Sequence, residues 1–263
     1  MTGELVHLGI TGGVGTITLD SPSNRNALSR ALMADLERQL AAALADQRVR
    51  IIVLTGAGTV FCSGADLKEQ REANVAGLQA GPGGLVPIIK SLWEAPKPVV
   101  GRINGHARAG GLGLMAACDL AVAVDTATFA FSEVRIGVAP AIISVVALPK
   151  MGLSAGLELM LTGDSFDAQR AVAVGLLNAA VPAADLHASV GRYASSLLLG
   201  GPQAMAETKR LVRHQSPAGD TGGAFERMAA LSARLFASPE AREGMTAFAE
   251  KRPPAWTTNS GAD

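Results

Sequence analysis

The first quarter of the chain places its apolar residues in the patterns of strands and of one helix. Residues 5–10 and 16–20 read as strands, and the glycines at 12–13 between them predict a hairpin. From Leu32 to Leu44 apolar side chains recur every three or four residues, which predicts a helix ending near residue 46. Ser29, just before it, is the expected N-cap.

The strand and helix patterns then recur along the chain. The apolar run 49–55 predicts a strand covered on both faces, followed by a glycine-containing loop at 56–64 and a helix beginning near Ala65. Further strands are expected at 98–104, 120–124 and 128–131, with a turn at 105–111 and a short helix at 112–118. Strand–loop–helix units returning in this way predict an α/β fold with a parallel or spiral sheet.

After residue 140 the pattern becomes mostly helical. The clearest predicted helices span residues 189–199, 202–214, 223–237 and 239–249, with a loop at 216–220. We therefore expect an α/β core over residues 1–195 and a helical C-terminal region over residues 196–263.

Composition excludes several classes of protein. Of the 263 residues 48% are hydrophobic, and 23 Lys and Arg balance 23 Asp and Glu, which disfavours nucleic-acid and anionic-membrane surfaces. The two cysteines, Cys62 and Cys118, indicate no disulfide framework. No signal-peptide pattern or membrane span stands out, so we expect a cytoplasmic protein. His7, His187 and His214 have no partner at metal-ligand spacing, and we expect no metal.

Two glycine-containing loops carry the first candidate chemistry. Residues 61–69 and 104–113 each follow a predicted buried strand and lead into a helix. Small residues allow a ligand to approach the backbone, and the free amides at a helix start can point at it. Two such loops side by side could direct two N–H groups at one oxygen, as in an oxyanion hole. Either loop alone also fits simple tight packing.

Glu133 is the candidate proton-transfer residue. It lies in the segment 131–140, among apolar neighbours whose desolvation would raise the pKa of its carboxyl group. A carboxyl group with a raised pKa can both accept and donate a proton near neutral pH. The alternative is a surface carboxylate paired with Arg135 or another base.

Taken together, the motifs resemble the enoyl-CoA hydratase/isomerase (crotonase) family over residues 14–256. The segments that carry the resemblance are Asn26-Ala27-Leu28, Phe61-Cys62-Ser63-Gly64-Ala65-Asp66-Leu67-Lys68, Pro96-Lys97-Pro98-Val99-Val100, Asn104-Gly105-His106-Ala107, Gly110-Gly111, Cys118-Asp119, Ser132-Glu133, Leu161-Thr162-Gly163-Asp164, Gly175-Leu176 and Phe248-Ala249-Glu250-Lys251-Arg252. The resemblance implies a spiral of ββα units with a helical C-terminal region, assembled as trimers or dimers of trimers.

The resemblance also assigns roles to residues. It implies that the amides of Ala65 and Gly110 form an oxyanion hole for a thioester carbonyl, with Glu133 as acid and base. Coenzyme A would belong to the substrate, and no separate cofactor is implied. The implied binding residues for the acyl-CoA are Arg25, Cys62, Gly64, Ala65, Asp66, Leu67, Lys68, Arg108, Gly110 and Lys251, of which Arg25, Lys68 and Lys251 would contact the nucleotide phosphates.

One position departs from the family pattern. Hydratases of the family commonly carry a second glutamate, and the corresponding residue here is Gly113. Hydration of a 2-enoyl-CoA with Glu133 alone is the leading prediction, because the sequences of residues 104–107, 111–114 and 139–144 resemble those of bacterial hydratases that act on methylglutaconyl-CoA-like substrates. A Δ3-Δ2-enoyl-CoA isomerase, which needs one base, is the alternative.

Other interpretations use other residues. Arg108 stands where the family has an apolar residue, and it could pair with a substrate carboxylate or face solvent. A relative that binds acyl-CoA without catalysis would fit Gly113 but not Glu133. A thioester hydrolase with Cys62 as nucleophile and His106 as base is a further alternative. Residues 12–15 lack the spacing of a dinucleotide-binding motif.

Overall fold

The computed structural model describes residues 4–69, 72, 84–214, 234 and 238–258. It begins with β1 (Val6–Thr11) and β2 (Val14–Leu19), which pair antiparallel. Gly12 and Gly13 in the turn both have positive φ, which only glycine adopts readily, so the predicted hairpin is confirmed. The predicted helix at 223–237 and the predicted loop at 216–220 lie almost wholly outside the described residues.

Two sheets form the core. The larger has the order β1-β2-β3-β5-β7-β10, and the smaller has the order β4-β6-β8-β9. The remaining strands of the larger sheet are β3 (Ile51–Gly56), β5 (Val99–Ile103), β7 (Leu120–Val124) and β10 (Ala179–Val181), all parallel. The smaller sheet contains β4 (Val60–Cys62), β6 (His106–Arg108), β8 (Thr128–Ala130) and β9 (Phe166–Asp167).

Each turn of the chain contributes one strand to each sheet and then a helix. β3 and β4 precede α3 (Leu85–Glu94), β5 and β6 precede α4 (Gly110–Ala117), and β7 and β8 precede η2 (Ser132–Ile136) and α5 (Ala141–Thr162). The predicted α/β spiral of ββα units is therefore confirmed. The short helix expected at 112–118 begins two residues earlier, because Gly110 and Gly111 already belong to its first turn.

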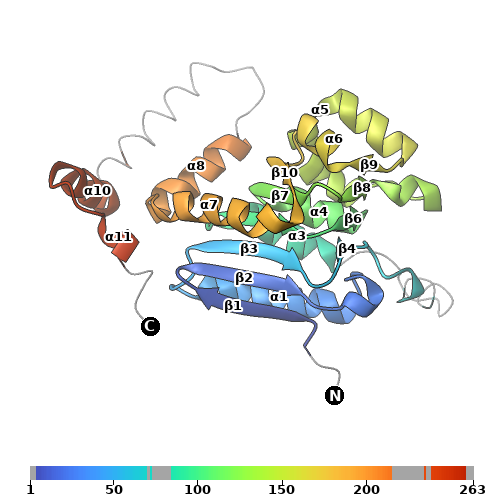
Figure 1. Ribbon diagram of the computed structural model, residues 1–263, viewed down its shortest axis with the longest axis horizontal. Helices are drawn as coiled ribbons and strands as arrows, with labels where there is room; N and C mark the ends of the chain where they lie inside the picture. Colours follow the sequence, from blue (N-terminus) through green and yellow to red (C-terminus); the bar gives the residue numbers. More distant parts are fainter. Residues whose placement is uncertain (1–3, 70–71, 73–83, 215–233, 235–237, 259–263) are drawn as a thin grey trace.

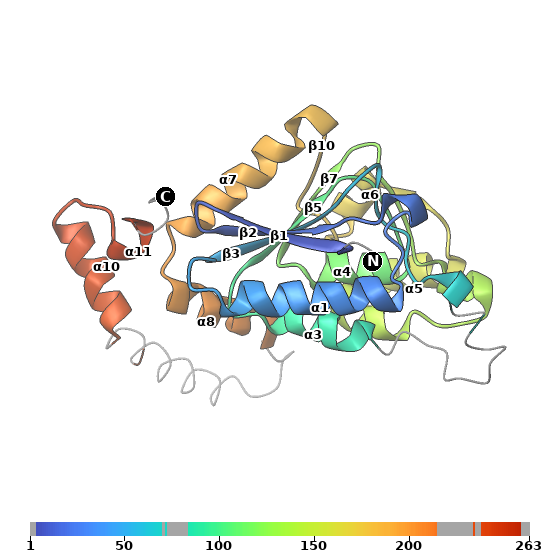
Figure 2. The ribbon, with the colours of Figure 1, turned by 90° about the horizontal axis from the view of Figure 1, so that it is seen from below.

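Helices cover both faces of the larger sheet. α1 (Arg30–Ala45), α3 and α4 lie on one face, and α7 (Leu186–Leu198) crosses the other (Figure 2). Ser29 accepts a hydrogen bond from the amide of Leu32, as expected of an N-cap. Shorter elements are η1 (Pro22–Asn24), α6 (Ala168–Ala173) and η3 (Ala183–Asp185).

α5 is apolar and long, but it is not straight. By length and composition it is the one helix of the described segments that could span a membrane. Gly152 has φ 74° and ψ 169°, which breaks the helix near Pro149 into two pieces. Since a spanning helix needs about 20 continuous residues, neither piece is long enough. α5 packs against α4, so it belongs to the folded core.

The described helices of the C-terminal region are α8 (Pro202–His214), α10 (Pro239–Ala249) and α11 (Ala255–Thr258). α10 and α11 lie together at one end of the molecule, opposite β4 and α5 (Figure 1). Arg50, just before β3, donates hydrogen bonds to the carbonyls of Leu198, Gly200 and Trp256. This arginine connects α11 to the amino end of β3. The division of the chain at residue 195 stays a prediction.

Candidate active site

Asn26 fixes the first glycine loop from within. It is fully buried, and its side-chain amide donates to the carbonyls of Ala57, Val60 and Phe61 while its oxygen accepts from the amide of Ser21. Two residues later, the amide of Leu28 donates to Gly64 at 2.8 Å. The motif at 26–28 therefore holds the loop after β4 in place.

The two glycine loops pack backbone against backbone. A Cβ atom on Gly64, whose φ is +88°, would lie 2.9 Å from the carbonyl oxygen of Arg108. A Cβ atom on Gly111 would lie 2.4 Å from the carbonyl oxygen of Cys62. Real side chains do not fit such spaces, so these glycines are required by close approach. The pairing of β4 with β6 continues the same contact.

Leu28 connects the two amides proposed for the oxyanion hole. Its backbone forms a parallel bridge with Ala65, and its Cδ1 lies 2.8 Å from the place where a Cβ atom of Gly110 would be. Ala65 and Gly110 are thus neighbours across one leucine. In the part of the chain that the structure describes, neither of their N–H groups donates to a protein acceptor.

Gly110 begins α4, where the amides of a helix have no intrahelical acceptors and the dipole favours negative charge. The preceding residue, Ala109, has φ 46° and ψ −118°, a conformation that non-glycine residues rarely adopt. Its carbonyl accepts from Leu112 and Gly113, and its amide donates to Ala130 at 3.1 Å. Strain of this kind is typical of functional sites.

Glu133 follows the strand that Ala109 contacts. It is half-buried in η2, and its Oε2 atom is buried without a hydrogen-bond partner in the described residues. Burial raises the pKa of this carboxyl group above its ordinary value, and a hydrogen bond to its own backbone partly opposes the shift. The alternative pairing with Arg135 is wrong, since Arg135 pairs with Asp164 at 2.5 Å.

The space beside Gly113 is filled by apolar side chains. A Cβ atom there would lie 2.4 Å from Cγ2 of Ile143 and 2.9 Å from Cδ1 of Ile89. Ile143 comes from α5 and Ile89 from α3, and both are buried. A glutamate at position 113 therefore cannot fit unless Ile143 moves. The sequence showed the glycine, but it did not show that two isoleucines fill the space a glutamate side chain would need.

The residues predicted to bind the acyl-CoA divide into two groups. Cys62 and Gly64 are buried in the first loop, whereas Leu67 and Lys68 are exposed at its helical end. The carboxylate of Asp66 accepts from the amides of Lys68 and Glu69. Arg25 is exposed, and its carbonyl accepts from Ser63 in the same loop. Arg25 and Lys68 are therefore both exposed, one bound through its backbone to the first loop and the other at that loop's end.

Lys251 lies elsewhere. It is exposed between α10 and α11, and α11 is attached to Arg50 at the amino end of β3. Arg25 and Lys68 lie beyond the carboxyl end of that strand, which spans about 20 Å for its six residues. Within one chain the structure does not bring Lys251 to the other two cations, because the C-terminal helices lie at the far end (Figure 1). The prediction of a shared phosphate site is thus not supported within a single chain.

Arg108 is held by the smaller sheet. Its guanidinium donates to the carbonyl of Ala107 at 2.9 Å, to the hydroxyl of Thr128 at 2.7 Å and to the carbonyl of Thr128. Burial lowers the pKa of this half-buried guanidinium. Neither interpretation from the sequence foresaw these contacts, because Thr128 lies 20 residues away along the chain.

The structure argues against the thioester hydrolase. Cys62 is fully buried, and burial raises the pKa of its thiol to about 12, so a thiolate does not form near neutral pH. The ring nitrogen Nδ1 of His106 is bound to the backbone and side chain of Thr128. Over the described ranges no three His, Cys, Asp or Glu side chains form a metal-binding group, and the absence of a metal stays a prediction.

The fold and the paired glycine loops define a class of ββα-spiral α/β proteins, and comparison with known proteins identifies which one. The family model for enoyl-CoA hydratase/isomerase matches residues 9–259. A carnitinyl-CoA dehydratase of Proteus mirabilis is 34% identical over 258 residues, covering 96% of this chain and 98% of that protein. The chain belongs to the enoyl-CoA hydratase/isomerase (crotonase) family.

Solved structures agree. An enoyl-CoA hydratase/isomerase from Marinobacter aquaeolei superposes with a TM-score of 0.88 at 30% identity, over 97% of this chain and all of that one. A structure from Mycobacterium avium paratuberculosis K-10 is 42% identical with a TM-score of 0.70, over 96% of this chain and 99% of that one. The crotonase fold predicted from the motifs is confirmed, and the chain is a crotonase-family enzyme.

Proposed function

We propose that the enzyme adds water reversibly to a 2-enoyl-CoA thioester. The observation that carries the proposal is the buried Oε2 of Glu133, which has no hydrogen-bond partner among the described residues. Glu133 follows, three residues on, the carbonyl of Ala130 that the second glycine loop binds. A carboxyl group with a raised pKa is suited to move a proton near neutral pH. The names of two relatives, an enoyl-CoA hydratase and a carnitinyl-CoA dehydratase, support the same reversible reaction read in its two directions.

The amides of Ala65 and Gly110 would receive the thioester oxygen. As hydroxide character develops on a water at the β-carbon, Glu133 takes the water proton and the carbonyl oxygen becomes an enolate. The protonated Glu133 then returns a proton to the α-carbon, which regenerates the carbonyl. One lost amide donor in such a site typically costs about a hundredfold or more in rate. Coenzyme A leaves and enters with the acyl group, and the proposal needs no other cofactor.

The apolar filling around Gly113 favours a second candidate, the Δ3-Δ2-enoyl-CoA isomerase. Ile143 and Ile89 occupy the space where a second carboxylate would hold water. A single base can take a proton from C2 of a 3-enoyl thioester and return it at C4. A protein that only binds acyl-CoA is the third candidate, and the desolvated carboxyl group of Glu133 argues against it.

Incubation with 2-enoyl-CoA and 3-enoyl-CoA esters separates these candidates. Product mass reveals water addition, and ultraviolet absorbance of the conjugated thioester reveals double-bond movement, which leaves the mass unchanged. A protein that only binds the ester changes neither. We expect Glu133→Gln to abolish turnover while acyl-CoA binding persists. The matched control is Glu37→Gln, on the exposed face of α1, which should keep full activity. Near-normal turnover by Glu133→Gln would refute the acid–base assignment.

The quaternary state and the nucleotide contacts belong to the same proposal. We propose a homotrimer or a dimer of trimers in the cytoplasm, with Arg25 and Lys68 near the phosphates of the bound ester. Exposed apolar side chains of α5 support self-association: Val145, Leu153, Leu157 and Leu161 are each at least 52% exposed. Sedimentation should give three or six times the chain mass of 26.8 kDa. A monomer would contradict this part of the proposal.

A further inference from the structure

A cavity of about 300 Å³ lies between α3 and α8, away from the candidate active site. Its lining residues are Trp93, Glu94, Ala95, Pro96, Ala206, Lys209, Arg210 and Arg213. Lys209 and Arg213 bind the carbonyls of Leu92 and Ala117, at the C-terminal ends of α3 and α4. Gly110 begins α4 seven residues before Ala117, and at about 1.5 Å per residue the helix separates the two places by about 10 Å.

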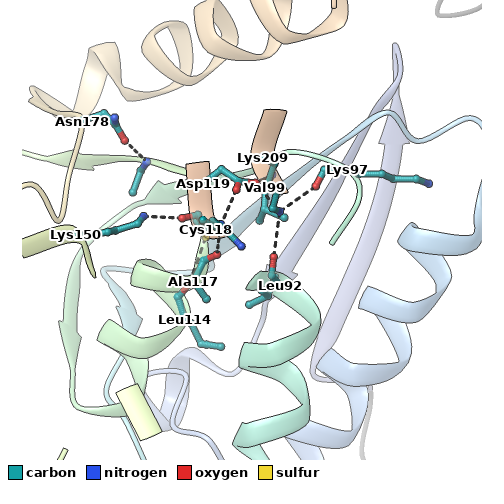
Figure 3. A network of polar contacts seen from close by, with 12 residues as sticks. Leu92, Lys97, Val99, Leu114, Ala117, Cys118, Asp119, Lys150, Asn178 and Lys209 are labelled. Carbon is teal, nitrogen blue, oxygen red and sulfur yellow. Dashed lines mark hydrogen bonds and ion pairs between the residues drawn. The ribbon is translucent and has the colours of Figure 1, made fainter. Parts of the chain in front are cut away.

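The cavity wall carries more positive than negative charge. Lys209 and Arg213 are each only 9% exposed, and both pair with the one carboxylate of Asp119, at 2.8 Å and 2.7 Å. Lys209 completes its bonds with the carbonyls of Leu92 and Lys97, as Figure 3 shows. Behind them, Lys150 binds the carbonyl of Cys118 at 2.6 Å. Burial lowers the pKa of both Lys209 and Arg213, as expected for cations that lack full compensation.

Arg213 has one donor group left over. Its Nη2 atom binds Asp119 and Ala117, but its Nη1 atom is buried and has no acceptor among the described residues. The guanidinium carbon lies 3.8 Å from the centre of the Trp93 ring. A buried unpaired donor costs free energy unless a ligand or water binds it. Guanidinium groups bind carboxylates and phosphates with paired hydrogen bonds, and the indole offers an apolar surface beside them.

We infer that this cavity is a second ligand site, which binds a small organic anion through Arg213 and Trp93. Because Nη1 is buried, the guanidinium of Arg213 must turn toward the cavity for a carboxylate or phosphate group to bind it, and Arg210 at the exposed rim adds a second positive charge. The apolar body of the ligand lies against Trp93, Pro96 and Ala206. The volume, at the lower end of ligand pockets, limits the ligand to a small metabolite.

Titration of the full-length enzyme with two probe anions tests the site. Cyclohexanecarboxylate and inorganic phosphate are added at constant ionic strength, and binding is followed by calorimetry. Trp256→Phe leaves Trp93 as the one tryptophan of the chain, so its fluorescence reports on the cavity itself. We expect saturable binding of at least one probe. A response to the carboxylate alone or to phosphate alone identifies the head group.

Two variants on α8 give the matched comparison. Ala206→Glu places a carboxylate inside the cavity and should weaken probe binding at least tenfold. Thr208→Glu adds the same charge on an exposed position of the same helix, outside the lining, and should change it less than twofold. Arg210→Glu at the rim serves if Ala206→Glu does not fold, and it should weaken binding severalfold.

Three results would overturn the inference. One is the absence of saturable binding by either probe up to about 10 mM, the range of very weak complexes. Another is equal affinity in Ala206→Glu and the parent enzyme. The third is a change in oligomeric state alone in Ala206→Glu, which would mean that an acidic side chain of a second copy occupies the cavity.

Discussion

The tight packing around Gly113 makes a quantitative prediction. In Gly113→Ala the new Cβ atom would lie 2.4 Å from Cγ2 of Ile143, whereas carbon atoms in contact sit about 3.5–4.0 Å apart. Ile143 and Ile89 are buried and cannot turn away into solvent. Overpacking of this kind costs about 1–3 kcal/mol. The better helix propensity of alanine offsets it by about 1 kcal/mol.

Gly191→Ala separates the two effects. Gly191 lies inside α7, and a Cβ atom there would meet nothing within 4 Å. This variant should gain only the better helix propensity of alanine, and its free energy of unfolding should rise. The difference in free energy of unfolding between the two variants then measures overpacking, and we expect about 1–3 kcal/mol. In a chain of this size, each kcal/mol corresponds to about 2–4 °C in melting temperature.

Urea and thermal denaturation of both variants supply the measurement. The source of the clash is checked in the background of Ile143→Ala, which removes Cγ2. There, Gly113→Ala should cost clearly less than it does in the parent enzyme, since coupled neighbours do not add. If both glycine variants shift stability equally, or if Ile143→Ala leaves the cost unchanged, the space beside Gly113 is not filled as the structure has it.

Three further predictions concern charged groups. Because burial raises the folded-state pKa of Glu133, the folded chain holds its proton to higher pH than the unfolded chain, and stability falls as pH rises through that interval. Glu133→Gln should therefore melt higher than the parent at pH 7, and the gap should close near pH 4; a constant gap contradicts the shift. Arg108→Ala should reduce turnover of carboxylated and plain enoyl-CoAs equally, because the guanidinium is bound to Thr128. A selective loss on carboxylated esters in steady-state kinetics would instead support pairing of Arg108 with a substrate carboxylate. Asp119→Asn leaves Lys209 and Arg213 without their carboxylate and should lower the free energy of unfolding by about 3–5 kcal/mol. Urea titration measures the loss, and a value below about 1 kcal/mol would show that the two cations are paired elsewhere.

The sequence predicted those parts of the site that depend on local chain geometry. Some features require a particular residue type at a fixed position, so the sequence alone reveals them. These are the hairpin at Gly12 and Gly13, the N-cap at Ser29 and the two glycine loops. The recurrence of strand–loop–helix units followed from the alternation of apolar runs, whereas the ββα spiral was implied by the family resemblance. Glu133 was found because its neighbours along the chain are apolar, and burial indeed raises its pKa.

Contacts between distant segments could not be predicted in this way. Arg213 meets Asp119 across 94 positions, and Arg50 meets Trp256 across 206. Lys251 carries a family motif, yet its distance from Lys68 depends on where the C-terminal helices dock. Gly113 showed in the sequence that a carboxylate is missing, but only the fold shows that Ile143 has taken its volume.

The contact of main chain with main chain between the glycine loops limits how this enzyme can evolve. Any side chain at Gly64 or Gly111 would push the loops apart and move the amides of Ala65 and Gly110. Almost no substitution is therefore tolerated at these two glycines. Changes in packing can arise instead in the helices that surround the loops, where positions such as Ile89 and Ile143 can exchange volume with one another. Steric exclusion thereby fixes the backbone of the two loops, while the side chains packed around them stay free to vary.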